Sequence, residues 1–521
     1  MRARDTNLRR AEAPLEQPIL RPGQNCWRVE PAERAAVVVD GMAFFAAFVE
    51  AAARARHSIL IVGWDFNSSV RLQPQRRVRN GADRVGTFLD RLVKQRRSLN
   101  VYVLDWDFSV IYALERELLP SYRWARQTHR RFHFRLDSCH PLGAAQHQKI
   151  VVIDDAIAFV GGFDFASSRW DTPAHDPNDA RRIDPWGKPY APYHDVEMAV
   201  DGAAAAALGD LVRARWQRAT GERLPAPPRG LDAWPASLRP DLQGVDVAIA
   251  RTMPPYDGDH GAREVVALVV DCITAARRWL YVENQYLTSA AVGEALAARL
   301  HERDGPEIVI LQPRQCQGWL EETTMGVLRA RLLRRLLDAD RYGRLRVYFP
   351  DVAGLGDRRL TVHAKVLIAD DRLLRVGSAN LNNRSMGLDS ECDLTIDAGA
   401  DSDIQAAIAA VRDRLLGEHL GQPRDKVART LANTGSLIRT IETLGRAARG
   451  LRPLDPTVPD WLDQLVPEAA VVDPERPVDS DALLALLALR PANGPQPPAW
   501  LWAAGVATLG IGAALLASYV F

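Results

Sequence analysis

Two segments of the chain carry the same chemically capable residues in the same order. The first is HQKIVVIDDAIAFVGGFD at 147–164, and the second is HAKVLIADDRLLRVGSAN at 363–380. Each begins with a histidine and has a lysine two residues later. Side chains two apart on a strand point to the same side, so we expect each histidine to face a site together with its own lysine. The pairs are His147 with Lys149 and His363 with Lys365.

The scarcity of lysine makes these pairs stand out. The chain has 66 basic residues, of which only five are lysine. Lysine is a compact point charge and arginine is a broad planar fork, so the two are not interchangeable. Because two of the five lysines occupy the same position in the two segments, we interpret them as chemical groups rather than as part of a solvated surface.

Two imidazoles and two ammonium groups are suited to cleaving a phosphodiester. The lysines would neutralise the non-bridging oxygens, one histidine would attack phosphorus, and the other would protonate the leaving alcohol. Asn380 can donate a hydrogen bond to an oxyanion. Small residues near the end of each segment allow a close approach of the backbone. They are Gly161, Gly162, Gly377 and Ser378.

Each imidazole also needs a partner that fixes its tautomer. Acidic residues follow both segments, in YHDVEMAVDG and DSECDLTIDA, and aligning the apolar ends places Asp195 opposite Glu391. We expect these two carboxylates to bind the imidazole nitrogens that are not used for chemistry. Asp154 and Asp370 lie inside the two segments, and we interpret them as local structural caps rather than as catalysts.

The two segments end two copies of one longer pattern. An amphipathic helix followed by a buried strand at 42–66 reappears at 263–287, and further apolar segments follow in each copy. Strands that alternate with helices predict an α/β fold with largely parallel pairing. Two copies in one chain predict two tandem lobes related by a pseudo-twofold axis, a pseudo-dimer with one shared active site.

Composition divides the chain further. The expected parts are a leader at 1–35, a first lobe at 36–222, a Pro-rich linker at 223–245, a second lobe at 246–420, a Pro-rich tail at 421–498 and a transmembrane helix at 499–521. The last part carries no charge and would reach about 34 Å as a helix, enough for a hydrocarbon core of about 30 Å. A buried C-terminal helix is the alternative. We expect a protein of the cell (inner) membrane with one C-terminal span and a cytoplasmic body.

Charge and cysteine content exclude other classes. A net charge of +1 with 25% charged residues argues against a dedicated polyanion binder, and so against nucleic acid as a partner. Five separated cysteines with no C-x-x-C pair form neither a disulfide framework nor a zinc site. The extra residues at 171–190 include His175 and Asp176, and we interpret them as a solvated loop at the rim of the site rather than as a metal site.

The two segments resemble the HKD motifs of the phospholipase D superfamily, over roughly residues 36–420. The pieces GGFDFASSRWD at 161–171, His194–Asp195 and VENQYL at 282–287 resemble the eukaryotic-type branch in particular. The resemblance implies a covalent phosphohistidine intermediate and no cofactor or metal for the chemistry. It also implies that His147 is the nucleophile and that His363 is first the acid and then the base, an order that the residues alone leave open.

The resemblance implies a phospholipase D-type phosphodiesterase that cleaves membrane glycerophospholipids to phosphatidic acid. Its partners would be the phospholipid, a water or alcohol acceptor, and the membrane. A cardiolipin-synthase-like phosphatidyltransferase is the first alternative, and an HKD-type nuclease or a membrane tether with a vestigial site are weaker ones. The headgroup, the balance of hydrolysis and transfer, and the oligomeric state stay open at this point.

Overall fold

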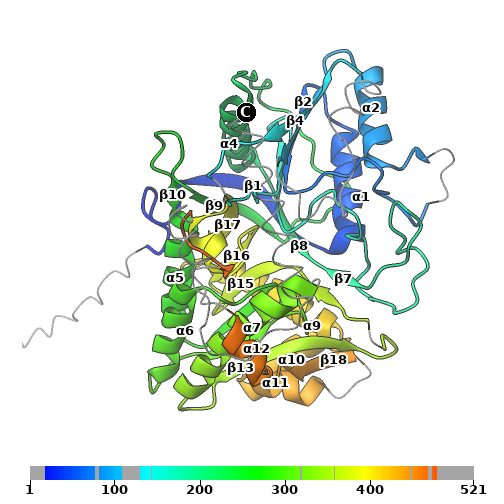
Figure 1. Cartoon of the computed structure of the whole chain (residues 1–521). Coiled ribbons are helices and arrows are strands. Elements are labelled where there is room, and N and C mark those ends of the chain that lie inside the picture. The colour runs from blue at the N-terminus through cyan, green and yellow to red at the C-terminus, as the bar shows by residue number, and fades with distance from the viewer. Residues whose placement is uncertain are drawn as a thin grey trace, which may run out of the picture.

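Figure 1 shows the computed structural model, which describes most of the chain. The described residues are 18–76, 81–107, 129–141, 143–316, 319–356, 358–445, 449–466 and 472–477. The elements of the first half are β1 (Arg28–Val39), α1 (Asp40–Ala52), β2 (Ser58–Gly63), α2 (Val85–Gln95), β3 (Asn100–Trp106), β4 (Phe132–Asp137), β5 (Ile150–Ile153), β6 (Ile157–Gly161), β7 (Tyr193–His194), β8 (Val196–Asp201) and α4 (Gly202–Thr220).

The second half follows a similar order. Its elements are β9 (Leu242–Met253), β10 (Ala262–Arg263), α5 (Glu264–Ala275), β11 (Trp279–Asn284), α6 (Ala290–His301), β12 (Glu307–Leu311), α7 (Trp319–Ala339), β13 (Leu345–Val352), β14 (Thr361–Val362), β15 (Lys365–Ala369), β16 (Leu373–Gly377), α8 (Asn383–Gly387), β17 (Glu391–Asp397) and α9 (Ser402–Leu420). The helix-then-strand repeat predicted from the sequence is therefore present as α1–β2 and α5–β11.

The described strands build one large mixed sheet that passes through both halves. Its order is β4-β3-β2-β5-β6-β8-β1 in the first half, continued by β9-β17-β16-β15-β11-β12-β13 in the second, with β10 beside β9. The two halves meet at β1 and β9, which pair antiparallel. Reading outward from this seam, each half has the same strand order, which is the structural form of the internal repeat.

The expectation of largely parallel pairing is wrong. Among the described strands, parallel pairs are confined to β2–β3–β4, β11–β12–β13 and the short pair β7–β14. The connections explain the difference. β5 turns into β6 through Asp154 and Asp155, and β15 turns into β16 through Asp370 and Asp371, all four with positive φ. Such tight turns can join only antiparallel strands, because a parallel pair needs a long crossover.

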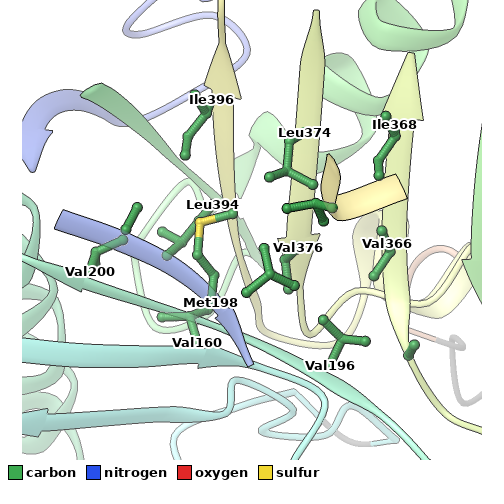
Figure 2. Packing of buried hydrophobic residues seen from close by; sticks show 14 of the residues in the cluster. Val160, Val196, Met198, Val200, Val366, Ile368, Leu374, Val376, Leu394 and Ile396 are labelled. Carbon is green, nitrogen blue, oxygen red and sulfur yellow. The ribbon is translucent and has the colours of Figure 1, made fainter. Parts of the chain in front are cut away.

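The two halves share one hydrophobic core. Figure 2 shows strands of the first half crossing strands of the second, with aliphatic side chains between them. Val160 and Met198 come from β6 and β8, and Val376 and Leu394 come from β16 and β17. All four are fully buried in one cluster. Burial of this kind stabilises by roughly 1.5–3 kcal/mol per large aliphatic side chain, so the halves hold each other in place.

Helices cover the rest of the sheet. In α1 the apolar residues Phe44, Phe45 and Phe48 fall on one face at helical spacing and pack in a second core beside Phe159 and Phe165. α5 and α6 line a third core under the second half. They stand side by side along one edge of the molecule in Figure 1.

The folded chain continues beyond the second lobe as we delimited it. α10 (Arg424–Thr434) packs on α9, α11 (Leu437–Leu444) packs on α10, and β18 (Arg449–Pro453) extends the sheet beside β13. A short helix, α12 (Asp460–Leu465), follows. In the part of the chain that the structure describes, no helix is both long and apolar enough to cross a bilayer. The predicted transmembrane segment 499–521 lies outside the described residues.

Candidate active site

Two short backbone contacts between the halves bring the motifs together. β7 pairs in parallel with β14, so that His194 lies beside Val362, the residue before His363. At the other motif, Gln146 bridges Ser390 and the amide of His147 donates to the Ser390 carbonyl at 3.0 Å. Each motif histidine is therefore placed by backbone that belongs to the opposite half.

The same contacts give each imidazole a carboxylate from the opposite half. Nδ1 of His147 lies 2.9 Å from Oε1 of Glu391, at the start of β17. Nδ1 of His363 lies 2.7 Å from Oδ2 of Asp195, directly before β8. Both carboxylates are fully buried. With Nδ1–H donating to the acid, Nε2 of each ring carries the lone pair and is left for chemistry.

Burial sets the protonation of these pairs. It raises the pKa of Glu391 to about 7 and the pKa of Asp195 to about 6. Burial, followed by the positive charges of Lys149 and Lys365, holds the pKa of His147 well below its usual value. Burial and Lys365 do the same to the pKa of His363. Both imidazoles are therefore neutral at physiological pH before substrate binds, as a nucleophile must be.

The two lysines lie in different surroundings. Nζ of Lys149 lies 3.3 Å from the carboxylate of Asp164 and donates to the carbonyl of His147. Nζ of Lys365 donates to the amide oxygen of Gln285 at 3.3 Å and to the carbonyl of His363. Desolvation is the main cause that lowers the pKa of Lys365 to about 7.

The repeat itself explains this asymmetry. Asn380 occupies the place in the second motif that Asp164 occupies in the first. An amide there gives Lys365 no counter-charge. The Asn380 side chain is buried, and its Oδ1 has no hydrogen-bond partner among the described residues. Only the amide nitrogen of Asn380 can donate to an anionic oxygen, because Oδ1 accepts hydrogen bonds and does not donate them.

The remaining predicted motif residues serve the backbone. The carboxylate of Asp154 accepts from the amides of residues 56, 57 and 58, and that of Asp370 accepts from the amides of residues 277, 278 and 279. Each aspartate thus fixes the chain at the start of the neighbouring strand. A Cβ at Gly162 would overlap the carboxylate of Asp195, and one at Gly161 would overlap Val196 and Glu197. The missing Cβ atoms of these glycines thus make room for neighbouring protein atoms rather than for substrate.

Three residues that sequence reasoning did not assign to the site also lie there. The Arg169 guanidinium stacks over the ring of Tyr193, 4.9 Å from its centroid, and Tyr193 lies 5.5 Å from the ring of His363. Gln285 holds Lys365. Arg169 adds a further positive charge, which lowers the pKa of His363. No spacing in the sequence links these side chains to the motifs, although Arg169 and Gln285 lie in pieces that resemble the family and Tyr193 directly precedes another.

The interpretation of 171–190 as a solvated loop is wrong for His175. That histidine is fully buried, with Nδ1 2.9 Å from Asp171 and Nε2 3.1 Å from Glu418. Arg182 is also buried and pairs with Asp171 at 2.9 Å. Asp176 is exposed. The loop folds back because its polar groups find charged partners inside the protein.

Comparisons with known proteins agree with the tandem arrangement of the two halves. Residues 51–227 match the family model described as "Phospholipase D", and residues 269–412 match the one described as "Cardiolipin synthase, PLD-like domain". The two matches fall on the two halves and contain one HKD motif each. The chain belongs to the phospholipase D superfamily.

Individual proteins that the chain resembles share less than a third of their aligned residues with it. The chain is 28% identical over 408 residues to "Phospholipase D1" of Schizosaccharomyces pombe, covering 60% of this chain and 29% of that protein. It is 24% identical over 460 residues to "Phospholipase D A" of Dictyostelium discoideum, covering 74% and 35%. It thus spans about a third of the length of these curated relatives. A solved phosphatidylserine synthase of Haemophilus influenzae covers 80% of this chain and 96% of its own, at 14% identity and a TM-score of 0.49.

Proposed function

We propose that the protein is a phospholipase D-type phosphodiesterase that cleaves the headgroup side of membrane glycerophospholipids. One observation carries the proposal: His147 and His363 each have Nδ1 on a buried carboxylate and leave Nε2 free, with two lysines beside them. Such a site can attack phosphorus, protonate a leaving alcohol and hold the phosphate charge. Similarity to phospholipases D supports a phospholipid as the substrate.

In the first step, Nε2 of His147 attacks phosphorus and forms a P–N bond while the bond from phosphorus to the headgroup oxygen breaks. His363 gives its Nε2 proton to that oxygen. The negative charge of the bound phosphodiester offsets the positive charges that depress the pKa of His363, and so allows it to arrive protonated. Glu391 and Asp195 fix the two rings throughout.

In the second step, His363 takes a proton from water or from an alcohol as that oxygen attacks phosphorus. A new P–O bond forms, the P–N bond to His147 breaks, and the ring becomes neutral again. Water yields phosphatidic acid, whereas an alcohol yields the transferred phosphatidyl ester. Because both acceptors use the same proton path, this geometry serves hydrolysis and transfer alike.

The test uses detergent-solubilised protein with mixed phospholipids and ethanol, read by lipid mass spectrometry. We expect phosphatidic acid and phosphatidylethanol from the wild type and neither from His147→Ala. Asp210→Asn is a matched control, because this exposed carboxylate contacts Arg213 and Arg28 and neither imidazole. A fully active His147→Ala protein would overturn the mechanism.

A phosphatidyltransferase that resembles cardiolipin synthase is the second candidate. The observation in its favour is the match of residues 269–412 to the family model with that description. The same assay separates the two activities, because a synthase would make cardiolipin from phosphatidylglycerol and little phosphatidic acid. Cleavage of single-stranded DNA without any lipid product would instead support a nuclease.

The location of the protein is a further part of the proposal. The uncharged segment 499–521 is long enough to anchor the body to a membrane. Leu509→Arg places a charge near the middle of that segment, where it costs at least about 2.5 kcal/mol. We expect the wild-type protein to stay in the membrane fraction after alkaline carbonate washing and the variant to be released. Retention of both would contradict the anchor.

A further inference from the structure

A cluster of buried ionisable side chains joins the first half to α9. It adjoins the candidate active site, because one member, His194, directly precedes Asp195 in the chain. The facing groups are Asp40 at the start of α1, His175, His194 on β7, and Glu418 on α9. The side chains of the first three are fully buried and that of Glu418 is 7% exposed. The proposed phosphodiesterase chemistry uses none of them.

The four side chains converge with the spacing of metal ligands. His175 Nε2 lies 3.1 Å from Glu418 Oε1 and 3.7 Å from Asp40 Oδ2. His194 Nδ1 lies 2.9 Å from Glu418 Oε1 and 3.1 Å from Asp40 Oδ1. Ligands at about 2.0–2.1 Å around a tetrahedral zinc ion are about 3.4 Å from one another. The four observed separations fall on both sides of that value.

In each of the two imidazoles, the nitrogen that faces away from the cluster contacts a carboxylate, as it does in many metal sites. Nδ1 of His175 lies 2.9 Å from Asp171, and Nε2 of His194 lies 2.7 Å from Glu283. A metal-binding histidine almost always donates its second N–H to a carboxylate, a carbonyl or water, which fixes the ring and raises its basicity. Both rings therefore have an orienting partner on the side that faces away from the centre of the cluster.

Asp40 provides an independent sign of a missing partner. Its carboxylate is fully buried, and Oδ2 has no hydrogen-bond partner among the described residues. At 3.7 Å, His175 Nε2 is too far away to supply one. The cluster therefore contains a buried carboxylate oxygen without a hydrogen-bond partner among the described residues.

Carboxylates outnumber guanidinium groups in and around the cluster. Two arginines face them, Arg182 on Asp171 and Arg449 beside Asp40 and Glu418. The excess negative charge is met either by a divalent cation or by protons on the facing histidines, which include His419 at 3.2 Å from Glu283. The four carboxylates are those of Asp40, Asp171, Glu283 and Glu418.

We propose that Asp40, His175, His194 and Glu418 bind a divalent transition metal ion, zinc in the first place. Two imidazoles with two carboxylates suit zinc better than magnesium or calcium, which prefer oxygen ligands alone. The ion is structural. It ties α1 and the 171–190 loop to α9, and through His194 it fixes the segment that carries Asp195.

The experiment is a metal analysis of the intact protein purified without chelators from zinc-supplemented cells. Inductively coupled plasma mass spectrometry is expected to find about one zinc ion per chain, with two imidazoles in the zinc X-ray absorption spectrum. Asp40→Asn and His175→Gln should each lose most of it, and Asp171→Asn should weaken zinc affinity about 10- to 100-fold. His140→Gln, which removes another histidine paired with a carboxylate, should keep the full content.

The alternative is that two protonated histidines neutralise the carboxylates without a metal. Wild-type protein with less than about a tenth of an ion per chain, and no rise in Tm on addition of zinc, would establish that alternative and overturn the proposal. So would zinc bound through cysteine sulfur, or content unchanged in Asp40→Asn. If the variants do not fold, the wild type still decides, because a chelator should lower its Tm and added zinc should restore it. None of these readouts requires the enzyme to be active.

Discussion

The carboxylate of Asp195, from the first half of the chain, lies 2.7 Å from Nδ1 of His363, from the second half. Glu391, from the second half, makes the equivalent contact with His147 of the first half, where Oε1 lies 2.9 Å from Nδ1. Each histidine therefore contacts a carboxylate of the opposite half. The shared core and the exchanged carboxylates assemble the candidate active site from two copies of a simpler unit.

The first prediction concerns these carboxylates. Asp195→Asn and Glu391→Gln keep the shape of the side chain but remove the charge that fixes the ring tautomer. We expect each to lower kcat by about 10²- to 10⁴-fold, the usual contribution of acid–base catalysis. The rate of phosphatidylethanol formation measures it, with Asp210→Asn as the control. Near wild-type rates in both variants would show that the acids only fill space.

The sequence predicts the repeat and the helix-then-strand units because both rest on local periodicity. It does not predict which acid serves which histidine. That depends on β7 and β14, each two residues long and without a pattern of its own. The burial of His175 is equally invisible, since its partner Glu418 is 243 residues away in the chain. Long-range partners of this kind decide the site, and a single sequence carries no local sign of them.

A second prediction follows from the unequal lysines. Because the pKa of Lys365 is about 7, raising the pH through that value removes its charge and weakens phosphate binding. On the acid side, protonation of Glu391 and Asp195 removes the acceptors of the imidazoles. We expect a narrow, bell-shaped profile of kcat/KM with its maximum near pH 7, because the pKa values of Glu391 and Lys365, which bound it, are both about 7.

Asn380→Asp tests whether Lys365 sets the basic limb of the profile, which is the fall in kcat/KM at high pH. A carboxylate at this position should raise the pKa of Lys365 and move that limb up by roughly 1 to 3 pH units. Asp164→Asn is the control variant. It deprives Lys149 of its partner at 3.3 Å and leaves the contact of Lys365 with Gln285 unchanged, so the basic limb should stay in place. If Asn380→Asp does not shift the profile, Lys365 does not set it.

A third prediction concerns a difference between the motifs: the first has Gly162 where the second has Ser378. The shorter carboxylate of Asp195 lies where a Cβ at Gly162 would be. In the second motif, the longer Glu391 accepts a hydrogen bond from the Ser378 hydroxyl. Gly162→Ser should displace Asp195 and lower kcat by at least about 10²-fold, while the circular dichroism spectrum stays unchanged.

The double variant Gly162→Ser with Asp195→Glu rebuilds the arrangement of the second motif in the first. It should recover part of the lost rate, because the longer acid can reach His363 past the new side chain. Asp195→Glu alone provides the comparison. Equal rates in the single Gly162→Ser variant and the double variant would contradict this steric explanation.

The fourth prediction concerns the core between the halves. Leu394 is fully buried there, among side chains of β6, β8 and β16 (Figure 2). Leu394→Ala leaves a cavity that both halves line, and should lower the free energy of unfolding by about 2–5 kcal/mol. Leu337→Ala, at a side chain that is 48% exposed, should change it by less than about 0.5 kcal/mol. Urea unfolding followed by tryptophan fluorescence and circular dichroism measures both.

The two probes should shift together in Leu394→Ala, since removing contacts shared by both halves weakens them as one unit. Two separate transitions, of which only one moves, would mean that the halves unfold independently.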